Sequence, residues 1–117
     1  MGDRGQVRLV SKGKPDIYLY SHWGASDLPK VVAEALDRGR PRWGDDEYLN
    51  RIIFNEMTRG LEFEETGFGI GTSQHGDVWR VVSIDHDNRQ VAIIDDGTVG
   101  IQASFEKFIE LYSLVKF

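Results

Sequence analysis

Alternating hydrophobic and polar positions predict strands near the N-terminus and through the C-terminal half of the chain. Residues 6–12 (QVRLVSK) alternate in this way, and residues 17–21 (IYLYS) are rich in β-branched and aromatic side chains. The turn between them contains glycine and proline, which is typical of a β-hairpin. The glycines of a later segment, 67–71, let a large side chain such as Trp79 or Trp23 approach closely. Further strands are predicted over residues 78–84, 90–94 and 98–101.

Apolar residues that recur every three to four positions predict three helices. The first begins after Asp27, just before a proline in its first turn, and ends near Gly39, where we expect a left-handed cap. Its apolar face carries Leu28, Val31, Val32, Ala35 and Leu36. The second begins at the acidic residues 45–47, which suit the positive end of the helix dipole, and runs to Gly60. Ser104 caps the third helix. The apolar residues of this last helix are Phe105, Phe108, Ile109, Tyr112 and Leu114.

This order of elements lacks the regular alternation of strand and helix that a parallel sheet requires. We therefore expect an α+β fold with a mainly antiparallel sheet of about six strands, an N-terminal hairpin plus a C-terminal meander. Two or three helices pack on one face of that sheet. The 117 residues show no repeat and no linker, so the chain is interpreted as one domain, 1–117.

Composition and charge exclude several classes of protein. The chain has 14 Lys and Arg against 19 Asp and Glu, a net charge of −5, which argues against binding of duplex DNA. No apolar run approaches the roughly 20 residues that cross a bilayer, and no signal peptide is evident, so we expect a cytoplasmic location and no membrane partner. With no cysteine there is no disulfide, thiol nucleophile or cysteine-ligated zinc.

Charge is also unevenly divided along the chain. Residues 1–59 hold ten Lys and Arg against nine Asp and Glu, whereas residues 60–117 hold four against ten. A dipolar surface of this kind favours a homo-oligomer or orients a partner. The alternative is that acidic turns simply keep a β-rich half in solution.

Two aromatic clusters are candidates for ligand binding. His22, Trp23 and Gly24 follow a strand and precede a helix start, whose free amides suit a phosphate while the indole stacks on a base. Arg40 and Arg42 lie directly before Trp43 in the sequence. Their guanidinium groups suit a second phosphate, and the indole of Trp43 offers a face on which a base can stack. Each cluster also has a structural interpretation, in which Trp23 fills the core and Trp43 packs under the second helix.

A metal site is the rival interpretation of the histidines. His22, His75, Asp77 and His86 supply the residue types of a histidine and carboxylate site. The sequence has no HExxH spacing, and the segment around His86 (DHDN) is equally typical of a solvated hairpin turn. Sequence motifs of serine hydrolases, dinucleotide-binding folds and phosphate-binding loops are also missing from the chain.

Three short motifs carry a resemblance to known proteins. The opening residues 1–4 (MGDR), the segment 17–24 (IYLYSHWG) and the segment 66–70 (TGFGI) resemble a group of small uncharacterised proteins of bacteria and bacteriophages. That group has a glycine-arginine N-terminal strand and a "YLY-x-HWG" strand end. It has no established activity, so the resemblance implies a bacterial or phage setting and supplies no catalytic residues.

Together these observations predict a small non-enzymatic binding protein without a cofactor. In a phage setting it would be an accessory or counter-defence protein that binds a host protein or sequesters a small nucleotide. The candidate ligand-binding residues are His22, Trp23, Gly24, Arg40, Arg42 and Trp43. The alternatives are a small metal-dependent hydrolase, using the histidines and Asp77, and a structural or protein-interaction module.

Overall fold

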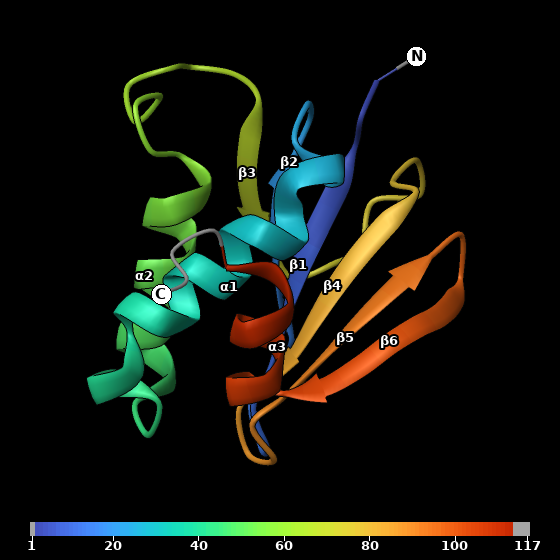
Figure 1. Ribbon diagram of the computed structural model, residues 1–117. Helices are drawn as coiled ribbons and strands as arrows, with labels where there is room; N and C mark the ends of the chain where they lie inside the picture. The colour runs from blue at the N-terminus through green and yellow to red at the C-terminus, as the bar shows by residue number, and fades with distance from the viewer. Residues whose placement is uncertain (1, 114–117) are drawn as a thin grey trace.

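A computed structural model describes residues 2–113 (Figure 1). The described strands are β1 (Gly5–Val10), β2 (Ile17–Ser21), β3 (Phe68–Gly71), β4 (Arg80–Asp85), β5 (Gln90–Asp95) and β6 (Thr98–Ser104). The α-helices are α1 (Leu28–Arg38), α2 (Asp46–Met57) and α3 (Phe105–Tyr112), and the 3-10 turns are η1 (Ala25–Asp27) and η2 (Arg40–Arg42). Among these described helices none is long and apolar enough to span a bilayer.

The six strands form one sheet in the order β3-β2-β1-β4-β5-β6. Neighbouring strands are antiparallel except for β1 and β4, which are parallel. The N-terminal hairpin therefore supplies two inner strands, and the meander of β4, β5 and β6 extends the sheet on one side. After the two long helices, β3 adds to the far edge beside β2 instead of joining the meander. The predicted α+β fold with a mainly antiparallel sheet is confirmed.

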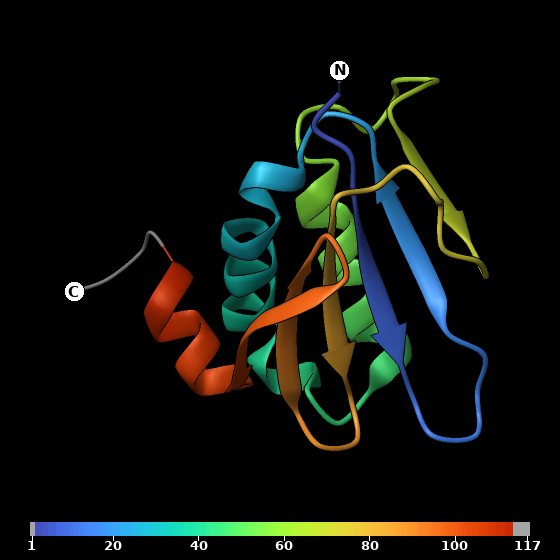
Figure 2. The same ribbon diagram turned by 90° about the vertical axis from the view of Figure 1, so that its right-hand side faces the viewer.

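All three α-helices cover the same face of the sheet (Figure 2). Val7 of β1 and Val82 of β4 lie opposite each other and are fully buried, and they meet Val32 and Leu36 of α1 in one hydrophobic core. Because side chains alternate along a strand, Gln6 and Arg8 point to the opposite face. This burial of one sheet face against helices follows from the alternation in the sequence.

The helix ends are fixed partly by caps and partly by packing. Ser104 Oγ accepts a hydrogen bond from the Lys107 amide at 3.1 Å, which confirms the predicted cap of α3. The left-handed cap expected at Gly39 is wrong, because this residue has φ −90° and ψ 11°. A Cβ atom at Gly39 would lie 2.7 Å from Leu49 Cδ1 and 3.0 Å from the Ala35 carbonyl oxygen, so the missing side chain allows α1 to pack closely against α2 here. The predicted apolar position Leu114 lies outside the described residues.

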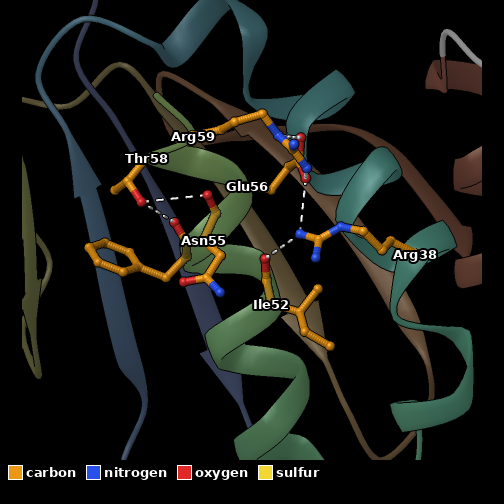
Figure 3. Close-up of polar contacts among 7 residues, drawn as sticks. Arg38, Ile52, Asn55, Glu56, Thr58 and Arg59 are labelled. Carbon is orange, nitrogen blue, oxygen red and sulfur yellow. Dashed lines mark hydrogen bonds and ion pairs between the residues drawn. The ribbon is translucent and has the colours of Figure 1, made fainter. Parts of the chain in front are cut away.

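A polar contact ties α1 to the end of α2 (Figure 3). Glu56, whose side chain is only 9% exposed, accepts hydrogen bonds from Arg38 at 3.0 Å and from both Nε and Nη2 of Arg59 at 3.0 and 2.8 Å. Arg38 also reaches the Ile52 carbonyl, and the Thr58 hydroxyl donates to the Phe54 carbonyl at 3.0 Å. The hydrogen bond from Arg59, followed by that from Arg38, holds the pKa of Glu56 below its ordinary 4.5.

We expect Glu56→Gln to reduce the free energy of unfolding by about 1 kcal/mol near neutral pH, since both arginine partners are partly exposed. The carboxyl pKa is lower in the folded state than in the unfolded chain. Its contribution is therefore fully present above pH 4.5 and is lost as the pH falls below that value. Urea unfolding from neutral pH down through pH 4.5 should show a smaller loss of stability in Glu56→Gln than in the wild type. Glu110→Gln, at a carboxylate that is 70% exposed, is the control and should follow the wild type.

Candidate functional site

His22, Trp23 and Gly24 form the chain exit from β2, directly before η1 and α1. The His22 amide donates to the Gly67 carbonyl at 2.9 Å, and its ring nitrogen Nδ1 shares a hydrogen bond with the Tyr20 hydroxyl at 2.9 Å. Trp23 is 59% exposed, so the interpretation of this residue as a core side chain is wrong. The structure places a large apolar ring at the surface here.

The Trp23 ring is held in place by Gly67, in the segment that leads into β3. A Cβ atom at Gly67 would lie only 2.3 Å from Trp23 Cζ3, and this glycine has φ +100°, a value that residues with side chains rarely adopt. The His22 ring contacts the indole edge-on, with ring centroids 5.1 Å apart. The expectation that a glycine makes room for Trp23 is confirmed, and the position that does so is Gly67.

Trp23 forms one wall of an apolar groove of about 200 Å³. The groove lies between the start of α1, the end of α2 and the first residues of β3. We call it the Trp23 groove. Its lining residues are Ser21, Trp23, Gly24, Asp27, Leu28, Val31, Met57, Leu61 and Phe68. Only one of these side chains, Asp27, carries a charge.

Trp23 and Leu61 line the groove, while two further large apolar side chains lie close to lining residues in the sequence: Phe63 is two residues after Leu61, and Ile70 is two residues after Phe68. Leu61 is 47% exposed, Ile70 on β3 is 64% exposed, and Phe63 is 98% exposed. Together with Trp23 these residues form what we call the apolar patch. Three exposed glutamates, Glu62, Glu64 and Glu65, are sequence neighbours of Leu61 and Phe63 in this patch. Exposed apolar residues gathered in this way mark interaction surfaces in soluble proteins.

The second predicted cluster lies at the other end of α1. Trp43 Nε1 donates to the Leu36 carbonyl at 2.9 Å, and the indole packs edge-on against Phe105 with centroids 5.3 Å apart. Arg40 lies over the Trp43 ring and is paired with Asp37 at 2.8 Å. Trp43 is therefore primarily a packing residue, and the contacts that hold it come from the end of α1 and from α3, where the structural interpretation placed it under the second helix.

The two predicted clusters do not form one nucleotide site. Arg42 lies over the Tyr48 ring with its guanidinium carbon 4.8 Å from the ring centre. This cluster is separated from Trp23 by the whole of α1, whose 11 residues span about 16 Å. Within residues 2–113, the six predicted ligand-binding residues therefore do not line one pocket.

The residues of the predicted metal site do not all meet, although His22 and His75 both contact Tyr20. His75 stacks on Tyr20, with centroids 4.2 Å apart, and Asp77 pairs with Arg4 at 2.9 Å. His86 lies at the opposite end of β1 from His22, where its amide donates to the Val10 carbonyl at 3.0 Å. Within residues 2–113, no three histidine or carboxylate side chains converge as a metal site requires. The grouping of His22, His75, Asp77 and His86 is therefore wrong.

His86 is not the solvated turn residue that the sequence suggests. The residue is only 7% exposed, and its Nε2 atom contacts Asn50 Oδ1 at 2.7 Å. Burial lowers the pKa of His86 below the usual 6.5, although the nearby Asp46, Asp87 and Asp85 oppose that shift. The imidazole is therefore neutral at pH 7.

Comparisons with known proteins assign no family to the chain. No protein-family model matches it, and neither a curated protein nor a solved structure matches it. The resemblance to small bacterial and phage proteins stays a prediction.

Proposed function

We propose that the chain is a non-enzymatic binding protein that docks a partner protein in the Trp23 groove. The observation that supports this is the apolar patch, in which four large side chains stay exposed and two of them, Trp23 and Leu61, line an apolar cavity. Full burial of one such side chain contributes about 1.5–3 kcal/mol. Tryptophan and other aromatic anchors dominate the binding energy of protein interfaces. A partner that covers Trp23 and Phe63 would therefore gain most of its binding free energy from these two side chains.

The chemistry of the rim specifies the partner. Glu62, Glu64 and Glu65 are exposed beside the apolar patch, and Asp27 lies in the groove itself. Opposite charges at the rim of an interface favour association and exclude like-charged partners. The partner segment should therefore present an apolar side chain flanked by lysine or arginine.

This surface favours a protein over a small nucleotide. The side chains that line the groove include no lysine, arginine or histidine, so no cationic side chain there complements a phosphate. The bacterial or phage setting implied by the resemblance makes a host protein the proposed partner, consistent with an accessory or counter-defence role. A second copy of the chain is the competing occupant, and native mass spectrometry over a range of protein concentrations separates the two.

Selection from a random-peptide library tests this proposal and does not require the partner to be identified first. We expect the wild-type protein to enrich peptides with an aromatic or aliphatic anchor next to basic residues. Trp23→Ser and Phe63→Ser should each weaken binding of those peptides at least about tenfold, since each removes more than about 1.4 kcal/mol of apolar contact. Phe63 is 98% exposed, so its loss should leave stability unchanged.

Tyr48→Ser provides the matched control. Tyr48 is also an exposed aromatic residue, at 51%, but it lies at the start of α2, whereas Met57 at the end of that helix lines the groove. Its removal should leave peptide binding intact. Equal binding to Trp23→Ser and to the wild type would contradict the proposal.

A further inference from the structure

A second cavity lies at the opposite end of the sheet from the Trp23 groove. It has a volume of about 380 Å³ and is enclosed by the β1–β2 turn, the β4–β5 turn and the start of α2. We call it the turn pocket. The side chains that bear on its chemistry are Lys12, Lys14, Asp46, His86, Asp87 and Arg89. Its size is in the range of sites for small molecules.

Two cations of the turn pocket are left free by the fold. Lys14 is neutralised by Asp46, with the ammonium 2.7 Å from the carboxylate. The Asp87 carboxylate accepts a hydrogen bond from the backbone amide of Lys12 at 2.6 Å. Within residues 2–113, the Lys12 ammonium and the Arg89 guanidinium form neither a hydrogen bond nor an ion pair. In a protein of net charge −5, this pocket therefore offers two unpaired positive groups.

His86 forms a buried part of the wall of the turn pocket. Because Asn50 Oδ1 accepts a hydrogen bond, Nε2 of His86 carries the proton, and Nδ1 is left as an acceptor. This Nδ1 atom is buried and has no hydrogen-bond partner among the described residues. A buried polar atom without a partner is costly, and such atoms are rare in folded proteins. Because Nδ1 is closed off from the cavity surface, the two free cations carry the binding chemistry of this pocket.

We propose that the turn pocket binds the phosphate group of a small phosphorylated molecule that also carries hydroxyl groups. Lys12 and Arg89 hold the phosphate, because lysine and arginine form strong charge-assisted hydrogen bonds to phosphate oxygens. The Asp87 carboxylate accepts hydrogen bonds from the hydroxyl groups. This site is separate from the Trp23 groove, so it stands or falls independently of the proposed docking function.

Titration with ribose 5-phosphate, followed by NMR of the backbone amides, tests this inference. We expect saturable shifts confined to residues 12–14, 44–46 and 86–89, and no saturable shift with ribose. Lys12→Gln and Arg89→Gln should each weaken binding about tenfold. Lys107→Gln, at an exposed lysine on α3, should bind like the wild type, and so should Trp23→Ser.

Each of three results would overturn the inference. The first is saturable binding of ribose with the same affinity as ribose 5-phosphate, which would remove any role of the phosphate. The second is unchanged binding in both Lys12→Gln and Arg89→Gln, and the third is the absence of a saturable shift in the wild type. Arg89→Gly guards against misfolding, since Arg89 has φ 51° and glycine adopts that backbone readily. It should fold and lose binding as Arg89→Gln does.

Discussion

Phe105→Ala should lower the free energy of unfolding by about 3–5 kcal/mol, the range found for removal of a buried phenylalanine. Phe105 is fully buried and is the first residue of α3. Its ring contacts Trp43 edge-on, and its amide donates to the Arg89 carbonyl at 3.0 Å. The residue thus joins α3, the segment before α2 and the β4–β5 turn, so the cavity cannot collapse without moving three elements.

Urea unfolding monitored by circular dichroism measures this loss. Leu111→Ala, on the same helix but 47% exposed, is the control and should cost about 0.5 kcal/mol or less. A loss below about 1 kcal/mol for Phe105→Ala would mean that α3 contributes little to the core.

Gly67→Ala should destabilise the protein by about 2–4 kcal/mol, because strain and overpacking each cost about 1–3 kcal/mol. The backbone at Gly67 has φ +100°, and the added Cβ would overlap the Trp23 ring at 2.3 Å. The Trp23 side chain would have to leave its position, which would also disrupt the groove. Gly76→Ala is the matched control, since a Cβ there meets no atom within 4 Å.

A double-mutant cycle separates the two causes. In a Trp23→Ala background the steric overlap is gone, so Gly67→Ala should cost about 1–2 kcal/mol less than in the wild type. An identical cost in both backgrounds would show that Trp23 does not rest on Gly67. Such a result would remove the structural basis of the Trp23 groove.

Local patterns are sufficient to predict most of the secondary structure. The apolar period and first-turn proline of α1 predict its range, and the turn residues between β4 and β5 predict that hairpin. The parallel pairing of β1 with β4 is not predicted, because no local signal links Val7 to Val82 across the intervening helices. No local pattern places β3 at the far edge of the sheet either.

The candidate site is predicted only in part. The sequence indicates Trp23 as a ligand-binding residue, but a tryptophan at a strand end fits either the core or the surface. Its exposure depends on the backbone of Gly67, a distant contact. The alternation of apolar and acidic residues in the segment 61–65 (LEFEE) is the overlooked signal for the rest of the patch. The buried state of His86 depends on Asn50 of α2, which the sequence of the turn does not reveal.

The most direct test of a docking surface with this chemistry is a charge reversal of its rim. A variant that combines Glu62→Lys, Glu64→Lys and Glu65→Lys changes only exposed positions, so it should fold as the wild type does. The same random-peptide library is then selected on both proteins. We predict that the wild type enriches apolar anchors flanked by lysine or arginine, and the variant the same anchors flanked by aspartate or glutamate. Enrichment of the same flanking charge on both proteins, or of peptides without an apolar anchor, would contradict the account.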